Sequence, residues 1–341
     1  MHILLMQSSR SRLLAQRRVR SYVARYGVPD LIHAHGSMWG GYAAMLCARD
    51  LRRPYVITED AESILTLDIS RGDRRRIVDV YRQAKRVIAV SDALKASIDC
   101  IAGAQIAEVV PNTVDSEYFH LPCAPRQSRP FVFLSVSDLS PSKRVDLSIR
   151  AFARLHASEP HARLVVIGSG KESSRLRELT HTLGVPDVIE FTGAIPRAAV
   201  RQRMWDANAL VLSSDVETFG VALIEALSTG LPVIATRCGG PEEIVTPDLG
   251  TLVECNDAAG LARAMGDMLR RDFDAAELRS SVTRRFGYAE VGKRLCEIYE
   301  SLLPAGEGAA KRRMRGEQSR ESRPSPGASR HPLPVGEGAA S

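Results

Sequence analysis

The 341-residue sequence is poor in aromatic residues, in paired cysteines and in long apolar runs, and each shortage argues against a class of protein. Aromatic residues make up 5%, too few for the platforms on which nucleic-acid bases stack, so we expect no nucleic-acid partner. The six cysteines include no Cys-x-x-Cys pair and have no histidine at metal-binding spacing, which argues against a zinc site or disulfide framework and predicts a reducing, cytoplasmic location. No apolar run approaches the ~20 residues that cross a bilayer.

The remaining composition is that of a soluble globular chain with room for two domains. Hydrophobic residues make up 44% and charged residues 25%, enough to bury two cores. The net charge of +6, mainly from arginine, fits nucleic acid, an anionic membrane surface or phosphate-bearing small molecules, and does not choose among them.

Short β-branched runs alternate with amphipathic stretches, which is typical of parallel sheets wrapped by helices. In the first part this pattern predicts helices at 39–52 and 92–101 between strands at 31–34, 55–58, 86–90 and 107–110. Ser91 and Asp92 are placed to cap the helix at 92–101. A second series predicts strands near 131–137, 163–168, 188–191, 209–212, 232–236 and 251–253.

This organisation predicts two Rossmann-like α/β domains that face an interdomain cleft. We expect an N-terminal domain at 1–115, a proline-rich linker at 116–130 and a C-terminal domain at 131–286. A helix at 287–303 is expected to pack back toward the N-terminal domain. Residues 304–341 are rich in Gly, Ser, Pro, Arg and Glu and almost lack large apolar side chains, so we expect a disordered tail.

Two glutamates follow the predicted strand at 209–212. Glu217 lies on a polar loop, and Glu225 lies about a turn into a helix that begins near Gly220 and Val221. The free N–H groups of such a helix start form an anion site, and a carboxylate accepts both hydroxyls of a vicinal diol such as a ribose. Considered alone, however, such a pair is more often a helix N-terminal charge and a solvated residue.

The spacing of Glu217 and Glu225 matches an E-x7-E motif, and the segment 217–245, together with 111–115 and 286–288, resembles the retaining GT-B glycosyltransferases of family 4, or group 1. The resemblance extends over residues 30–303. It implies that Glu217 is a catalytic residue that contacts the transferred sugar and that Glu225 holds the nucleotide ribose. It also places four neighbours at the donor: Thr218, Phe219, Gly220 and Val221.

Lys143 follows the predicted strand at 131–137 and is positioned to neutralise a diphosphate leaving group. It resembles the family's catalytic lysine, although the arginine that usually stands five residues earlier is Asp138 here. Arg144 is a candidate to replace that arginine, and a surface lysine without a role is the alternative interpretation.

Two strand ends supply further donor-site candidates. Gly168 and Gly170 alone are weak evidence, because the third glycine of a dinucleotide fingerprint and the glycine of a P-loop are absent. The resemblance places both glycines beside the nucleotide and Thr192 and Gly193 at its base-binding edge. The missing fingerprint also argues against a dinucleotide-dependent oxidoreductase.

In the N-terminal domain, His33 and His35 lie on one face of a predicted strand. No third metal ligand is evident and the family generally needs no metal, so we expect no metal or cofactor and assign His35 and Gly36 to the acceptor side. Asp60 stands where the family usually has a histidine near the reacting carbon, and we take it as a catalytic candidate. A carboxylate there accepts a hydroxyl hydrogen bond but brings negative charge toward a diphosphate donor.

The beginning of the chain departs from the family pattern of a strand, a glycine-rich loop and a helix. No glycine precedes Gly27, so we expect a shortened N-terminal domain, either a genuine variant or a truncated reading frame. Residues 10–25 are rich in arginine and predicted to be helical. The resemblance implies a weak peripheral contact of this helix with the inner face of the membrane.

The resemblance implies a retaining enzyme that moves a hexosyl group from a nucleotide diphosphate sugar to a hydroxyl of a lipid-linked or saccharide acceptor, as in glycolipid or polysaccharide synthesis. The alternative is a catalytically impaired GT-B remnant that binds nucleotide or partners an active transferase, motivated by Asp60, Asp138 and the missing glycine loop. The sequence identifies neither sugar, base nor acceptor.

Overall fold

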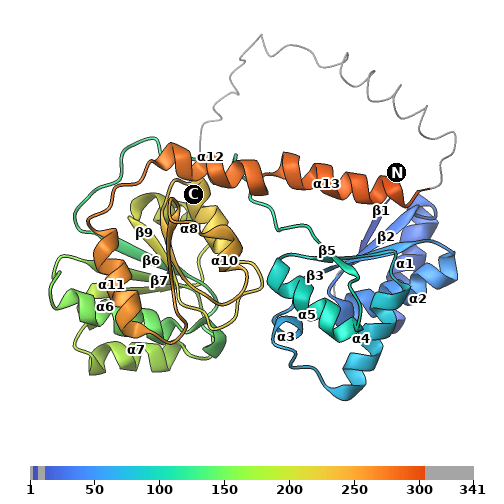
Figure 1. The fold of residues 1–341 in the computed structure, drawn as a ribbon, viewed down its shortest axis with the longest axis horizontal. Coiled ribbons are helices and arrows are strands. Elements are labelled where there is room, and N and C mark those ends of the chain that lie inside the picture. The colour runs from blue at the N-terminus through green and yellow to red at the C-terminus, as the bar shows by residue number, and fades with distance from the viewer. Residues whose placement is uncertain (1–2, 7–11, 304–341) are drawn as a thin grey trace, which may run out of the picture. The chain divides into compact units, whose positions relative to one another are not determined.

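The structure, a computed structural model, describes residues 3–6 and 12–303. These residues contain two parallel sheets with their surrounding helices (Figure 1). The tail predicted at 304–341 lies outside the described residues.

The N-terminal sheet has five parallel strands whose order in space follows their order in the chain. They are β1 (Ile3–Met6), β2 (Leu31–His35), β3 (Tyr55–Glu59), β4 (Arg86–Ala89) and β5 (Ala107–Val109). Because right-handed crossovers between sequential strands leave on the same side, the connecting helices gather on one face. These helices are α1 (Arg12–Tyr26), η1 (Ser37–Gly41), α2 (Tyr42–Leu51), α3 (Glu62–Leu65), α4 (Arg71–Gln83) and α5 (Asp92–Ala102).

The opposite face of this sheet is covered by α13 (Tyr288–Ser301). Alternate strand residues point to opposite faces, so Leu31 and Val56 face away from the crossover helices. They form one buried cluster with Val291 and Tyr299 of α13. The last helix of the chain thus completes the core of the first domain.

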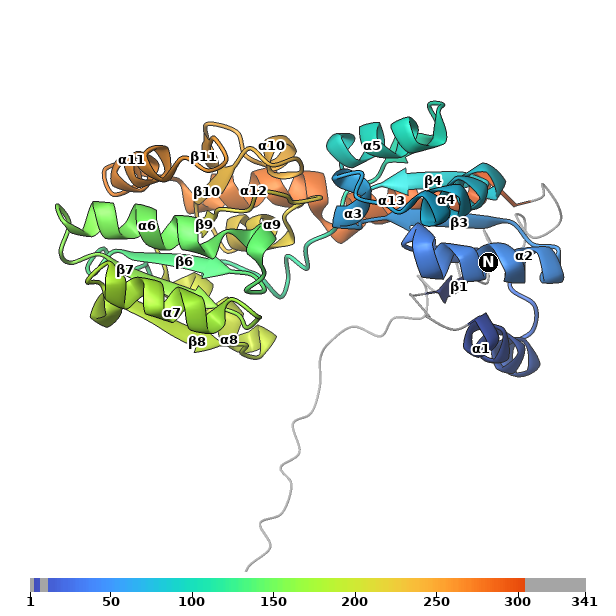
Figure 2. The same cartoon turned by 90° about the horizontal axis from the view of Figure 1, so that it is seen from below.

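The C-terminal sheet has six parallel strands in the order β11-β10-β9-β6-β7-β8 (Figure 2). They are β6 (Val132–Val136), β7 (Arg163–Ile167), β8 (Ile189–Gly193), β9 (Ala209–Leu212), β10 (Val233–Thr236) and β11 (Gly250–Val253). Their helices are η2 (Pro141–Lys143), α6 (Val145–His156), α7 (Ser173–Thr182), η3 (Pro186–Val188), α8 (Arg197–Asp206), α9 (Val221–Ser228), α10 (Pro241–Ile244), α11 (Ala258–Met268) and α12 (Ala275–Phe286). The chain order reverses between β6 and β9, and ligands of such sheets bind at the carboxyl ends of the strands beside that reversal.

The ten strands predicted from the sequence are all present, with ends shifted by at most two residues. The Ser91 cap is also confirmed, since its Oγ accepts a hydrogen bond from the Leu94 N–H at 3.1 Å. The helix predicted at 39–52 begins as the π-helix η1 before it continues as α2. The two-domain architecture with a shortened N-terminal domain is confirmed, and the helix predicted at 10–25 is present as α1. One element was not predicted: the strand β1, which pairs with β2.

Candidate active site

Lys143 and Glu217 come together where the order of the C-terminal sheet reverses. Lys143 ends η2 on the connection after β6, and Glu217 lies on the loop after β9, the strand paired with β6. The carboxyl ends of these two parallel strands lie side by side, which brings residues 74 positions apart into contact.

The ammonium group of Lys143 is held by two carboxylates. Its Nζ donates to Oε1 of Glu62 at 2.6 Å and to Oε2 of Glu217 at 3.1 Å. Glu62 lies in the first turn of α3 in the N-terminal domain and also accepts from the Ser142 hydroxyl at 3.3 Å. The side chains of Lys143 and Glu217 are 12% and 17% exposed, so the pair is shielded from bulk water but still reachable.

The charges of this cluster are coupled. Burial works to lower the pKa of Lys143, but the carboxylates of Glu217 and Glu62 outweigh it and the pKa is raised. Burial raises the pKa of Glu217 against the opposing effect of Lys143, and Glu62 and Asp138 add to the rise. One cation therefore faces several carboxylates, an arrangement that leaves Lys143 charged and ready to exchange a carboxylate for another anion.

Arg144, the candidate to replace the arginine missing at Asp138, is held by two aspartates, and its predicted role stays a prediction. Its Nη1 donates to both carboxylate oxygens of Asp215, at 3.1 and 3.0 Å, and its Nε donates to Asp146 at 3.1 Å. The backbone of Arg144 is left-handed, with φ of 46°, where the chain turns from η2 into α6. Its guanidinium is thus part of the scaffold behind Lys143.

The loop that carries Glu217 is fixed by backbone contacts with the loop after β10. The Glu217 N–H donates to the Cys238 carbonyl at 3.1 Å, and the Gly240 N–H donates to the Glu217 carbonyl at 2.8 Å. A Cβ at Gly240 would lie 2.2 Å from the Cα of Phe219, so only glycine permits this approach. Gly220, with φ of 105°, then starts α9 as predicted.

The side chain of Phe219 is a core group. It is 1% exposed and packs edge-on against Phe286, so only its backbone can border a donor. Thr218 is also buried, whereas Val221 is 41% exposed at the first position of α9. The predicted donor contacts of these three residues remain predictions.

Glu225 lies on α9, on the same β9–α9 unit as Glu217. Its carboxylate faces Arg197 Nη2 at 3.4 Å, and its side chain is 17% exposed. Burial raises the pKa of Glu225, and Arg197 opposes that rise. Both glutamates are thus half-buried side chains at one end of the sheet.

Gly168 and Gly170 let two loops pack together. A Cβ at Gly168 would lie 1.8 Å from the Ser137 carbonyl oxygen, and one at Gly170 would lie 2.4 Å from that of Leu139. Their glycine requirement therefore comes from packing beside the loop that leads to Lys143. Thr192 and Gly193 end the neighbouring strand β8, and the Gly193 carbonyl accepts from the Gly168 N–H at 3.0 Å.

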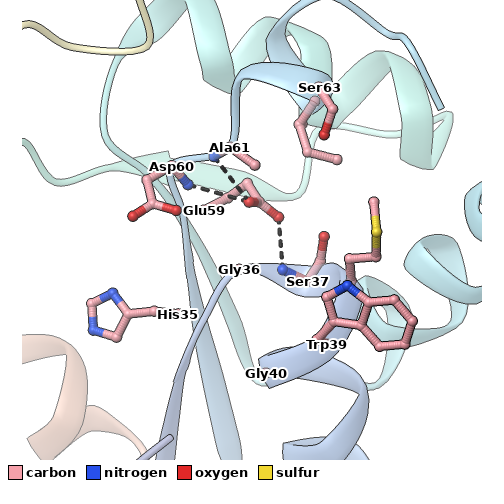
Figure 3. Close-up of a pocket in the computed structure, with 11 residues that line it drawn as sticks. His35, Gly36, Ser37, Trp39, Gly40, Glu59, Asp60, Ala61 and Ser63 are labelled. Atoms are coloured by element: carbon pink, nitrogen blue, oxygen red, sulfur yellow. Dashed lines mark hydrogen bonds between the residues drawn. The ribbon is translucent and has the colours of Figure 1, made fainter. Parts of the chain in front are cut away.

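A cavity of about 520 Å³ opens in the N-terminal domain at the ends of β2 and β3 (Figure 3). Three predicted residues line it: His35, Gly36 and Asp60. Trp39 of η1 lines it too and is 41% exposed. Ala61 and Ser63 also line it, and Glu62, which lies between them in the sequence, contacts Lys143.

Glu59 is a buried residue of the cavity that the sequence does not single out. It is fully buried, yet its carboxylate accepts hydrogen bonds from the backbone N–H groups of Ser37 at 2.9 Å, Asp60 at 3.2 Å and Ala61 at 3.3 Å (Figure 3). The Tyr81 hydroxyl donates a fourth at 2.9 Å. This carboxylate thereby holds together the loops that follow β2 and β3. In the sequence, Glu59 cannot be distinguished from other polar residues at strand ends.

His33 and His35 share a face, as predicted, and their rings stack 4.9 Å apart. His33 is buried, with Nδ1 2.6 Å from the Tyr299 hydroxyl and Nε2 2.9 Å from Thr58 Oγ1. Burial, aided by His35, lowers the pKa of His33 to about 4. His33 therefore links β2 to α13, and within the described residues no three His, Cys, Asp or Glu side chains gather into a metal site.

Comparison with known families accounts for both halves of the chain. Residues 124–285 match the family described as glycosyl transferases group 1, and residues 3–118 match glycosyltransferase family 4. The chain belongs to the group 1, or family 4, glycosyltransferases. The cluster of Lys143 and Glu217 thus lies in the half that matches the group 1 family.

Curated relatives of this glycosyltransferase span several organisms. It is 26% identical to the phosphatidylinositol N-acetylglucosaminyltransferase gpi3 subunit of Schizosaccharomyces pombe, over 83% of this chain and 63% of that protein. It is 28% identical to a D-inositol 3-phosphate glycosyltransferase of Acidothermus cellulolyticus, over 85% of this chain and 66% of that protein. The chain therefore spans slightly less than two thirds of the length of these two relatives.

Solved structures share the fold. The UDP complex of Anabaena Alr3699/HepE superimposes with a TM-score of 0.73 at 20% identity, covering 89% of this chain and 100% of that one. Sucrose-phosphate synthase from Thermosynechococcus elongatus gives a TM-score of 0.70 at 21% identity, covering 85% of this chain and 77% of that one. In the part of the glycosyltransferase that the structure describes, no helix has the length and apolar character needed to cross a bilayer.

Proposed function

We propose that this protein is a retaining glycosyltransferase that moves a hexosyl group from a nucleoside diphosphate sugar to a hydroxyl acceptor without a metal or cofactor. The meeting of Lys143 and Glu217 at the switch point of the C-terminal sheet carries this proposal. A cation at that place is positioned for a diphosphate, and a carboxylate 3.1 Å away is positioned for the sugar hydroxyls.

In the proposed reaction the bond between the sugar carbon C1 and the phosphate oxygen breaks, and the acceptor oxygen bonds to C1 from the same face. The acceptor proton passes to the departing phosphate, so no protein nucleophile is needed. Lys143 leaves Glu62 and neutralises the diphosphate, aided by free N–H groups at the start of α9. Glu217 accepts from the sugar and Glu225 from the ribose.

The acceptor side of the proposal lies in the N-terminal domain, at the cavity beside His35, Gly36 and Asp60. The names of the relatives include lipid and inositol phosphate acceptors, which supports an acceptor of the lipid-linked or saccharide class. The exposed arginines Arg17, Arg20 and Arg25 on α1 suit a peripheral contact with an anionic membrane surface on the cytoplasmic side.

The test is a panel of UDP-, GDP- and ADP-sugars, followed for transfer to saccharide and lipid acceptors and for donor hydrolysis. We expect turnover with one nucleotide class and a loss of roughly 100-fold or more in kcat/KM for Glu217→Gln. The exposed Glu290→Gln on α13 serves as the control and should match the wild type. The absence of both transfer and hydrolysis with every donor, or full activity of Glu217→Gln, would contradict the proposal.

A second candidate is a catalytically impaired relative that binds nucleotide or partners an active transferase. The observation that favours it is the excess of carboxylates: Glu62 and Glu217 hold Lys143, and Asp138 acts on Glu217. Asp60→His distinguishes the two, because a large gain in rate indicates a competent site slowed by its aspartate. Calorimetric nucleotide binding without turnover in both proteins supports the second candidate.

A further inference from the structure

The cavity beside Asp60 has an unusual charge for a site next to a diphosphate donor. Of the lining residues that the structure describes, none is a lysine or an arginine. Two carboxylates line it, those of Glu59 and Asp60. We propose that it binds an acceptor whose polyol ring carries a protonated amine, with Asp60 as the residue that selects the amine. This inference rests on the proposed transferase function and deepens it.

The negative charge available to a ligand is that of Asp60. Glu59 is fully buried, and its two oxygens already accept four hydrogen bonds. Asp60 is exposed, and among the described residues its carboxylate has no hydrogen-bond or ion-pair partner. A ligand ammonium group would supply the missing partner through a charge-assisted hydrogen bond.

Among the described residues that line the cavity, no lysine or arginine cancels this charge. His33 lies behind the cavity but stays neutral near pH 7, because burial lowers its pKa to about 4. The nearby Lys143 is held by Glu62 and Glu217. A phosphate-bearing acceptor would therefore meet a carboxylate without a compensating cation, which is unfavourable. In this respect the proposed acceptor differs from the phosphate-bearing acceptors in the names of the two relatives, which support only the broader lipid-linked or saccharide class.

The other end of the cavity favours a ring. Trp39 is 41% exposed, and its indole lies across the Glu59–Ser37 hydrogen bond from Asp60 (Figure 3). A flat indole packs well against the C–H face of a saturated ring while the polar edge stays accessible. The ring would thus rest on Trp39 with its amine toward Asp60.

The position suits an acceptor rather than an unrelated ligand. Ala61 and Ser63 line the cavity, and Glu62, between them in sequence, reaches Lys143 at 2.6 Å. The segment 61–64 therefore takes part in both the cavity and, through Glu62, the cluster around Lys143, which is why we assign the cavity to the acceptor.

The test compares four probes of one ring type by saturation-transfer NMR titration of the full-length protein: D-glucosamine, N-acetyl-D-glucosamine, D-glucose and D-glucose 6-phosphate. We expect glucosamine to bind about tenfold more tightly than the two neutral probes, and the phosphate to bind most weakly. Asp60→Asn should abolish the preference, and Trp39→Ala should weaken all four probes alike. Asp68→Asn, at an exposed position outside the cavity, is the matched control.

Equal binding of charged and neutral probes, tighter binding of the phosphate, or an unchanged preference in Asp60→Asn would overturn the inference. Circular dichroism and the thermal midpoint of Asp60→Asn verify that its fold is retained. Nucleoside diphosphate binding is measured in parallel. If the protein binds a nucleotide but shows no preference for the amine, only the inference about the acceptor fails. If it selects the amine but binds no nucleotide, the proposed transferase function is contradicted, while the proposed amine-binding role of Asp60 is retained.

Discussion

The loop after β9 and the loop after β3 occupy equivalent places, each at the carboxyl end of a parallel strand, but they are held in different ways. The β9 loop is fixed by backbone hydrogen bonds between Glu217 and the Cys238–Gly240 segment. The β3 loop is fixed by one side chain, the buried carboxylate of Glu59. One loop therefore depends on the close approach of two backbones, and the other depends on a single charged group.

This difference predicts different vulnerabilities. A backbone contact fails when an added atom separates the two chains, as at Gly240. A carboxylate contact fails when the acceptor is removed and several N–H groups lose their partner.

Glu59→Ala should have the largest effect. It strips the Ser37, Asp60 and Ala61 N–H groups and the Tyr81 hydroxyl of their acceptor inside the core, so we expect a loss of about 3–5 kcal/mol in unfolding free energy. Urea unfolding measures this loss. As a control, the exposed Glu290→Ala should change stability by about 0.5 kcal/mol at most. A loss below about 1 kcal/mol for Glu59→Ala would contradict the role of Glu59 in holding the two loops.

Gly240→Ala should cost about 2–3 kcal/mol, because its new methyl group meets the backbone of Phe219 and must push the two loops apart. Gly292→Ala is the matched control. Its added Cβ meets nothing within 4 Å on α13, so the substitution should stabilise by up to about 1 kcal/mol through helix propensity. Equal effects of the two substitutions would show that the loops do not need their close contact.

Acidification should destabilise the N-terminal domain through His33. Its pKa falls from 6.5 when unfolded to about 4 when folded, so the unfolded chain binds the proton first and stability falls as the pH drops through this window. Between pH 7 and pH 5 the expected loss is about 2 kcal/mol. Urea unfolding at both values should show this loss reduced in His33→Gln and retained in the exposed His181→Gln.

Glu225→Gln should have the smallest effect, since it keeps the shape of the side chain and weakens one proposed hydrogen-bonded contact with ribose. We expect nucleoside diphosphate affinity to fall by about fivefold, or about 1 kcal/mol, by calorimetry. The exposed Glu178→Gln on α7 is the control. An unchanged nucleotide affinity in Glu225→Gln would contradict the assignment of Glu225 to the ribose. It would not affect the role proposed for Lys143.

The strands, and the cluster of Lys143 and Glu217 in the C-terminal domain, could be predicted because they depend on local sequence patterns or on recognisable motifs. Glycines at 220 and 240 and the spacing from Glu217 to Glu225 are such patterns. The strand β1 was missed because its four residues are too few to show a periodic pattern. It forms a strand because it pairs with β2, where Ile3 lies opposite Leu31. Glu59, Glu62 and the ion pairs of Arg144 were missed because their roles depend on partners distant in sequence, such as Tyr81 and Lys143.

The central claim is that Lys143 and Glu217 form the site of the donor diphosphate, and calorimetric titration of UDP, GDP and ADP tests it most directly. The account predicts that the wild-type protein and the exposed Lys293→Ala control bind one of these nucleotides with equal affinity. Lys143→Ala should bind it at least about tenfold more weakly. Equal binding by Lys143→Ala, or no binding of any of the three by the wild type, would contradict the account.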